Sequence, residues 1–149
     1  MRQVNFGELA WQIVMAIRID CPRSRYRNAV SRNPDIRARA RRWIADYAAR
    51  RVAVFDFLPD DPAARLELLA AAAGSETADR QLHSMAHDHT DPARAAQLAL
   101  AADLARSLDR FEILTDRPEG PPFAMFGEDP VRSEEEATRA LAGHGPLFG

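Results

Sequence analysis

Arginine supplies all twenty basic residues of this chain, and eleven of them lie between Arg18 and Arg51. Only three acidic residues share that stretch, which therefore carries a formal charge of +8. Residues 52–149 hold eight arginines against eighteen acids, a formal charge of −10. A guanidinium group is a planar fork that suits phosphates, carboxylates and stacked bases. The pattern predicts one positive and one negative surface, and the positive surface is the first place to seek an anionic ligand.

Some of these arginines have an acidic residue within reach along a helix, and others do not. Asp35 can pair with Arg39, because residues four apart share a helix face. Asp46 can pair with Arg42 or Arg50 in the same way. The other cations surround a tyrosine, a combination typical of phosphate contacts with base stacking. We expect nucleic-acid contacts at Arg18, Arg23, Arg25, Tyr26, Arg27, Arg32, Arg37 and Arg41. The alternative is a solvated face, or one that meets the chain's own acidic half.

Two histidines have the spacing of metal ligands. His83 and His87 lie four residues apart, which places two imidazoles on the same side of a helix. No third ligand has a fixed spacing, and both histidines fall beside an apolar stripe rather than on it. We therefore predict a polar helix flank with no metal and no cofactor, and keep a histidine- or metal-dependent enzyme at this pair as an alternative.

The single cysteine excludes an internal disulfide. Cys21 and Arg27 have a Cys-x5-Arg spacing that resembles the phosphate loop of cysteine phosphatases. Such a loop needs converging backbone amides, yet Pro22 removes one and no glycine lies in between. We expect the nearby arginines to lower the pKa of Cys21, but the better interpretation is a small, half-buried apolar residue.

Capping residues and prolines indicate where the helices begin. Asn5 with Glu8 is a capping pair for a helix to about Ile19, although the apolar run 11–19 could instead form a strand. A short helix is expected near 24–31. Gly74 is a natural helix end and Ser75 a natural cap. Three further starts combine a cap with a first-turn proline: Asn33-Pro34, Asp61-Pro62 and Asp91-Pro92.

The helix after Asn33 should carry one apolar arc, made of Ile36, Ala40, Trp43, Ile44, Tyr47 and Ala48. Residues 52–58 are β-branched and aromatic, so they either continue this helix or form a short extended piece. The helix from Asp91 should be the longest and most amphipathic, reaching about Leu114. Residues 115–132 are rich in proline and glycine and predict an irregular strap. A capped helix at 133–143 and a loose tail at 144–149 should follow.

The fold class expected is all-α: one helical domain over residues 1–149, built as a compact irregular bundle of about five helices with a Pro/Gly-rich C-terminal strap. The cap-proline starts are 28 and 30 residues apart, near the period of helical repeats. Asn33-Pro34-Asp35-Ile36-Arg37 resembles the start of the inner helix in HEAT-type repeats, which makes a short HEAT-like repeat the alternative fold.

These features favour a non-enzymatic binding protein whose arginine-rich residues 18–51 contact nucleic acid, DNA or RNA, as a small subunit of a nucleoprotein complex. The alternative is a regulatory protein–protein adaptor or inhibitor that binds an acidic protein surface or forms a homodimer through its opposite charges. Its aromatic anchors would be Trp11, Trp43 and the segment 123–126. The longest apolar run, 11–17, is too short to cross a bilayer. No secretory signal is recognisable, so we expect a cytoplasmic protein without membrane contact.

Overall fold

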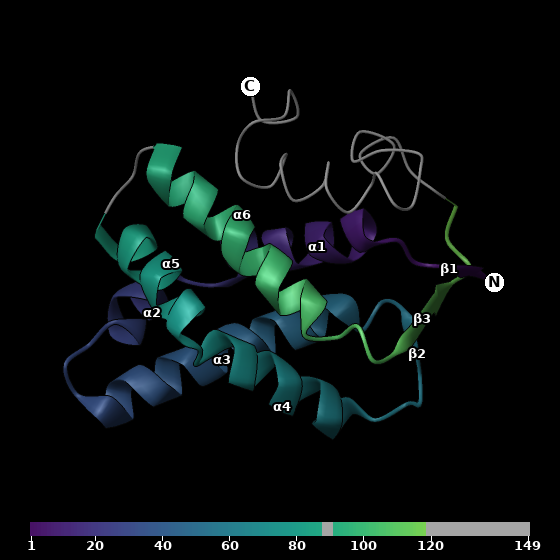
Figure 1. Cartoon of the computed structure of the whole chain (residues 1–149), viewed down its shortest axis with the longest axis horizontal. Helices are drawn as coiled ribbons and strands as arrows, with labels where there is room; N and C mark the ends of the chain where they lie inside the picture. The colour runs from purple at the N-terminus through teal and green to yellow at the C-terminus, as the bar shows by residue number, and fades with distance from the viewer. Residues whose placement is uncertain (88–90, 119–149) are drawn as a thin grey trace.

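The computed structural model describes residues 1–87 and 91–118 of the chain. They form six α-helices, one π-helical turn and three short strands, in agreement with the all-α prediction. In chain order these are β1 (Arg2–Gln3), α1 (Phe6–Met15), η1 (Ala16–Asp20), α2 (Arg23–Ala29), α3 (Pro34–Val52), β2 (Asp56–Leu58), α4 (Pro62–Ala73), α5 (Glu76–His87), α6 (Asp91–Arg106) and β3 (Glu112–Thr115). Figure 1 shows the helices stacked across one another, with the strands gathered at one end beside the N-terminus.

The predicted helix starts are confirmed by their cap geometry. The Asn33 side chain accepts hydrogen bonds from the first amides of α3, at 2.9 Å from Asp35 N. Asp61 caps α4 through the amide of Ala64 at 3.0 Å, and Ser75 caps α5 through the amide of Ala78 at 3.1 Å. Each bond satisfies an amide that has no partner inside its helix. The helices therefore begin where local chemistry places them.

The first helix is also as predicted, and the strand alternative for residues 11–19 is wrong. Asn5 accepts a hydrogen bond from the Glu8 amide at 2.8 Å, and α1 continues into the wider turn of η1. Glu8 is only 1 % exposed. Its carboxylate takes two hydrogen bonds from Arg2, at 2.5 and 2.9 Å. This ion pair, whose carboxylate is buried, fixes the first residues of the chain against the start of α1.

The small antiparallel sheet is the largest departure from the sequence prediction, although its strand β2 confirms the short extended piece given as an alternative for residues 52–58. Its strand order is β1-β3-β2. Arg2 pairs with Thr115, and Phe57 with Ile113. The predicted helix from Asp91 to about Leu114 is thus too long: α6 ends at Arg106, and α3 with 19 residues is the longest helix described. Residues 119–149, which include most of the predicted strap, the 133–143 helix and the tail, lie outside the described residues.

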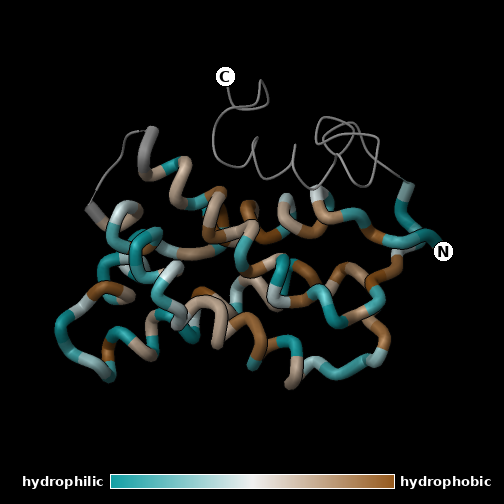
Figure 2. The backbone as a smooth tube through the Cα atoms, viewed as in Figure 1, coloured by the Kyte–Doolittle hydropathy of each residue, from teal (hydrophilic) through white to brown (hydrophobic). Residues whose placement is uncertain are grey.

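Helices that are far apart in the sequence pack against one another and so close the bundle. Helix α1 packs against α6 and α3, and α2 packs against α5, so helices do not contact their sequence neighbours alone, as they would in a repeat. Figure 2 shows hydrophobic residues recurring along the helices between hydrophilic ones. The largest fully buried apolar side chains are Ile13, Ile17, Ile44, Leu69, Leu82, Leu98, Leu100, Leu104 and Leu108. Among the described residues, no helix combines the length and apolarity that crossing a membrane requires.

Helix α3 departs from its predicted single arc. Ala40, Ile44 and Ala48 are buried, whereas Ile36 is 42 % and Trp43 36 % exposed. The predicted arc is too wide for all of its residues to be buried, because a helix at the surface of a bundle packs only one face against the core. Helix α3 therefore carries a second apolar stripe on its outer side.

Candidate nucleic-acid interface

Helix α2 turns its cations outward because its apolar residues face the core. Tyr26 and Ala29 are buried three residues apart, on the side that packs against α3 and α5. Arg23 and Arg27, one turn apart on the other side, are exposed, and Arg25 is half-buried between the two faces. The periodicity of an α-helix thus separates anchoring residues from residues able to meet a ligand.

Tyr26 does not provide the stacking surface expected from its position among the arginines. The side chain is only 5 % exposed, and its hydroxyl donates a hydrogen bond to the carbonyl of Ile17. Burial raises the pKa of this phenol well above its usual range. Tyr26 ties α2 to the π-helical turn, so the aromatic component of any interface must come from elsewhere.

Arg41 is likewise structural, although it was expected to contact a ligand. It is 9 % exposed and its Nε donates to the carbonyl of Ala29 at 2.9 Å. Its Nη2 pairs with Asp79 of α5. The hydrogen bond from Arg41 lowers the pKa of the Asp79 carboxyl. Arg41 therefore joins α3 to the end of α2 and to α5.

Two other expected contacts are partly engaged in the fold. Arg18 is half-buried, and its Nε donates to the side-chain oxygen of Gln97 at 3.1 Å. Burial lowers the pKa of Arg18, and the charge of Arg94 adds to this effect. Arg37 donates from Nη1 to the carbonyl of Ser31 at 3.0 Å, across the turn between α2 and α3. Both retain further N–H groups, but their positions are set by internal contacts.

Carboxylates pair with the arginines of α3 from Arg42 onward. Arg42 pairs with Glu67 at 2.8 Å, and Arg50 with Asp46 at 2.6 Å. Arg51 makes two hydrogen bonds to Asp20, at 2.5 and 2.7 Å. These hydrogen bonds lower the pKa of Asp20 and raise that of Arg51. The +8 stretch is therefore much less positive in its second half than its composition suggests.

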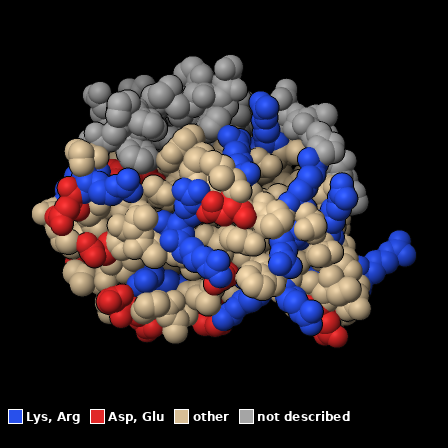
Figure 3. Space-filling view, turned by 180° about the vertical axis from the view of Figure 1, so that it is seen from behind, with Lys and Arg blue, Asp and Glu red and all other residues tan. Residues whose placement is uncertain are grey.

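The positive charge that remains lies on α2, the α2–α3 turn and the first turns of α3. Residues 22–39 contain six arginines and one acid, Asp35. The expected Asp35–Arg39 pair does not form. We call the following residues the basic surface: Arg23, Arg25, Arg27, Arg32 and Arg39. The last four form no ion pair with any residue that the structure describes. Figure 3 shows arginines outnumbering acids on the right of one face, with most acids toward its left and lower edges.

An exposed tryptophan takes the place expected for Tyr26. The Arg25 guanidinium carbon lies 4.7 Å from the centre of the Trp43 ring, a cation–π distance. The Trp43 ring lies 6.2 Å from that of Tyr47, tilted by 35°. Arg50 lies 5.9 Å over Tyr47 on its other side. The local signal that could have revealed this role is that Trp43 lies almost opposite Arg41 on the helix, away from the buried residues.

The histidine pair gains no further ligand in the part of the chain that is described. His83 is exposed, and its Nδ1 lies 2.8 Å from the Asp79 carbonyl and 3.6 Å from the Asp79 carboxylate. His87 is the last residue of α5, and His89 lies outside the description. No group of three His, Cys, Asp or Glu side chains able to hold a metal occurs in residues 1–87 and 91–118.

Cys21 is buried, and although Arg25 lowers its pKa as expected, the net shift is upward. Burial raises the pKa of the thiol to about 11, outweighing the opposing effects of the Tyr26 hydroxyl and Arg25. The chemistry of a cysteine phosphatase requires a thiolate at neutral pH. Arg27, the other member of the Cys-x5-Arg spacing, points into solvent. Cys21 therefore contributes to core packing and Arg27 to surface charge, and the two do not form one site.

Two hollows lined by described residues are large enough to be considered as ligand sites. One, of about 450 Å³, is lined by Arg37, Arg41 and Arg42 beside the end of α4. Because Asp79 and Glu67 already pair with two of these arginines, the hollow adds little unbalanced charge.

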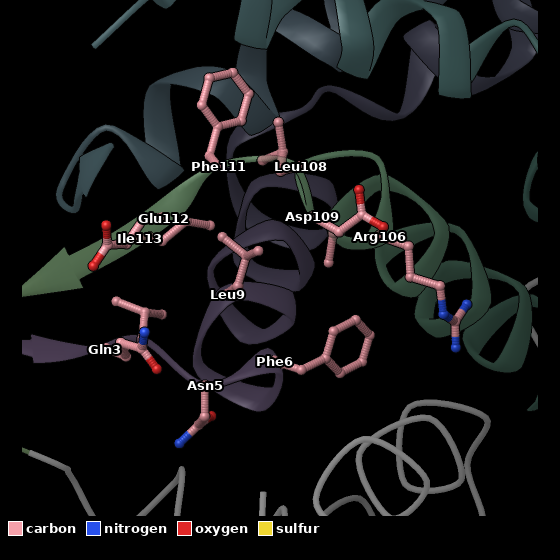
Figure 4. Close-up of a pocket in the computed structure, with 12 residues that line it drawn as sticks. Gln3, Asn5, Phe6, Leu9, Arg106, Leu108, Asp109, Phe111, Glu112 and Ile113 are labelled. Carbon is pink, nitrogen blue, oxygen red and sulfur yellow. The ribbon is translucent and has the colours of Figure 1, made fainter. Parts of the chain in front are cut away.

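The other hollow, of about 420 Å³, lies between the start of α1 and the chain from the end of α6 to β3. Its walls mix apolar and polar side chains, and the Arg106 guanidinium carbon lies 5.4 Å from the centre of the Phe6 ring. Figure 4 shows the Glu112 carboxylate pointing away from the side on which Asp109 and Arg106 lie. No serine, cysteine or histidine lines it. Its described walls thus lack an activated nucleophile or a pair of groups placed for proton transfer.

No protein-family model, curated protein or solved structure matches this chain.

Proposed function

We propose that this protein binds nucleic acid through the basic surface. The observation that carries the proposal is the concentration of arginines without carboxylate partners. Arg25, Arg27, Arg32 and Arg39 occupy adjacent elements and share one acidic neighbour in sequence, Asp35. Exposed guanidinium groups of this density are the residue type that contacts phosphates.

The shape of the charge distribution also supports a local contact. Residues 52–149 carry a formal charge of −10, so a long polyanion would be repelled away from the basic surface. Binding should therefore involve a short stretch of backbone and a few phosphates. Affinity should fall with salt because each neutralised phosphate releases condensed counterions.

The experiment compares two triple variants with the same change in charge. One replaces Arg27, Arg32 and Arg39 with glutamine. The other, the matched control, replaces Arg94, Arg110 and Arg117, which are exposed elsewhere on the described chain. Binding to labelled single- and double-stranded oligonucleotides, DNA and RNA, is measured across a salt series by fluorescence anisotropy.

Loss of three phosphate contacts should reduce the slope of log affinity against log salt by about 2, from roughly 0.7 per contact on a single strand. The control variant should keep the parental slope. Binding that does not depend on salt, equal losses in the two variants, or no binding by the parent would each contradict the proposal.

A protein–protein adaptor is the second candidate, favoured by one observation. The outer stripe of α3 exposes two large apolar side chains, Ile36 and Trp43, and aromatic residues are common anchors of protein interfaces. Size-exclusion chromatography at low and high salt separates the candidates. Self-association that salt abolishes would support the adaptor, whereas co-purified nucleic acid would support the first proposal.

A further inference from the structure

We infer that the basic surface is built for single-stranded nucleic acid, with Trp43 as the platform on which a base stacks. This inference rests on the proposed function and names its substrate class. The observation behind it is independent of charge. Two neighbouring rings on the outer side of α3, Trp43 and Tyr47, are flanked by one guanidinium at each end, Arg25 from α2 and Arg50 from α3.

Helical spacing places the α3 members of this row, Trp43, Tyr47 and Arg50, on one side of the helix, because they lie three or four residues apart. Arg39, four residues before Trp43, extends the same side toward the start of α3. Ala40, Ile44 and Ala48 face the core instead. The row is consequently held on a rigid element whose opposite side is packed, which keeps its planar groups in place before any ligand arrives.

Arg25 is fixed against the ring from the neighbouring helix. Its Nε is buried and has no hydrogen-bond partner among the described residues, so ring packing rather than a polar contact positions it. The guanidinium covers part of the Trp43 ring at 4.7 Å, and 36 % of the residue stays exposed. Both a ring and a guanidinium plane can stack on an unpaired base. The arrangement thus offers a stacking surface with a positive charge on it.

Base stacking distinguishes single strands from duplexes. In a duplex each base already stacks on its neighbours, so an outer platform could meet only the ends or the phosphates. In a single strand the base faces are available, and stacking adds to the phosphate contacts. A flexible strand can also follow the short basic surface, whereas a rigid duplex would extend toward the acidic half of the protein.

The row has a defined end, which limits the length of strand it can hold. Arg50 is paired with Asp46 at 2.6 Å, so its charge is largely balanced. Arg39 to Arg50 spans eleven residues, or about 16 Å along the helix axis at 1.5 Å per residue. This length suits a few nucleotides, with their phosphates directed to the arginines of α2 and the α2–α3 turn.

The test uses the full chain and two substitutions of Trp43. Trp43→Leu keeps an apolar side chain but removes the aromatic ring, and Trp43→Phe restores one. Thermal unfolding checks that both variants remain folded. A Trp11→Phe background leaves Trp43 as the sole tryptophan, so quenching of its emission by added oligonucleotide reports directly on stacking. The probes are a single-stranded oligonucleotide and its duplex, as DNA and as RNA, in the same salt.

We expect tighter binding of the single strand than of the duplex and quenching of Trp43. Trp43→Leu should weaken single-strand binding roughly tenfold, within the range measured for loss of one stacked base. Duplex binding should stay unchanged, and Trp43→Phe should recover most of the loss.

Equal binding of both forms, unaffected by Trp43→Leu, would overturn the stacking inference while leaving nucleic-acid binding by the arginines intact. Failure of the parent to bind any of the probes would instead overturn the proposed function, and this inference with it. Self-association that depends on Trp43 and excludes oligonucleotide would assign the stripe to a second copy of the chain, and would also overturn the inference.

Discussion

Replacing Asp79 with asparagine removes the carboxylate that holds a buried guanidinium. The Arg41 side chain is 10 % exposed and pairs with Asp79 of α5. Its other anchor, the Ala29 carbonyl at 2.9 Å, stays in place. A hydrogen bond to a charged group contributes about 1.5–3 kcal/mol when buried. Because the Asp79 side chain is 45 % exposed, solvent screens part of this, and we expect a loss of about 1–2 kcal/mol.

The loss should appear as a change in the free energy of unfolding by urea and as a lower Tm. For a chain of this size, about 1 kcal/mol corresponds to a shift of roughly 3 °C. Asp56→Asn is the matched control, because Asp56 is exposed and has no ion pair among the described residues. It should leave the free energy of unfolding nearly unchanged.

The dependence on pH follows from the direction of the pKa shift. The Arg41 hydrogen bond lowers the pKa of Asp79 in the folded protein. The stabilisation is therefore complete above the unfolded-state pKa, about 3.9, and is lost as the pH falls through the lower folded-state value. The difference in unfolding free energy between parent and Asp79→Asn should be constant near neutral pH and shrink below about pH 4. A variant as stable as the Asp56→Asn control at neutral pH would refute this account of Arg41.

Two further predictions concern Tyr26, which the sequence placed near a ligand, and Cys21, which it predicted to be half-buried; the structure buries both. Tyr26→Phe leaves the Ile17 carbonyl without its hydroxyl donor and should cost about 1–2 kcal/mol in urea unfolding, without changing the salt slope of oligonucleotide binding; weaker binding at unchanged stability would restore the stacking role of Tyr26. Cys21, with a pKa of about 11 and a buried thiol, should react with a thiol reagent at mildly alkaline pH only as fast as the protein unfolds, so rapid labelling of the native protein would contradict its burial.

Helix starts were predictable because their determinants are local. The caps at Asn33, Asp61 and Ser75 each bond an amide two or three residues away, so a few letters of sequence contain the whole interaction. The capping pair of Asn5 and Glu8 is of the same kind. The second partner of Glu8, the Arg2 guanidinium, was missed because nothing in the sequence shows that this carboxylate is buried.

The sheet could not be predicted, because its determinants are distant in the chain. Strands of two to four residues are too short to show an alternating pattern. Arg2 meets Thr115 only after the helices have packed. Residues 112–115 also continue the apolar pattern of α6, so periodicity alone extended that helix past its end at Arg106.

Whether an individual arginine is exposed or buried depends on how its helix is rotated about its axis, and amino-acid composition carries no information on that rotation. Arg39 and Arg41 are two residues apart on α3, yet Arg39 is exposed whereas Arg41 is buried, with 9 % of its surface exposed. Arg41 lies next to Ala40 and three residues before Ile44, and both of these are buried. A helical wheel of the sequence could therefore have placed Arg41 on the side of α3 that faces the core. The partner of Arg41, Asp79, lies 38 residues away and could not have been identified in this way.

The contrast between paired and unpaired arginines is the physical basis of the proposed function. Three arginines of α3, Arg42, Arg50 and Arg51, pair with carboxylates, so the fold is able to neutralise its own surface cations. At Arg27, Arg32 and Arg39 it does not do so within the described chain, and these exposed side chains contribute no core packing that would offset their mutual repulsion. The use of arginine instead of lysine throughout the chain does not explain which arginines have an acidic partner and which do not. An anionic ligand is the partner that would stabilise the basic surface, which is why the salt dependence of binding tests the proposal directly.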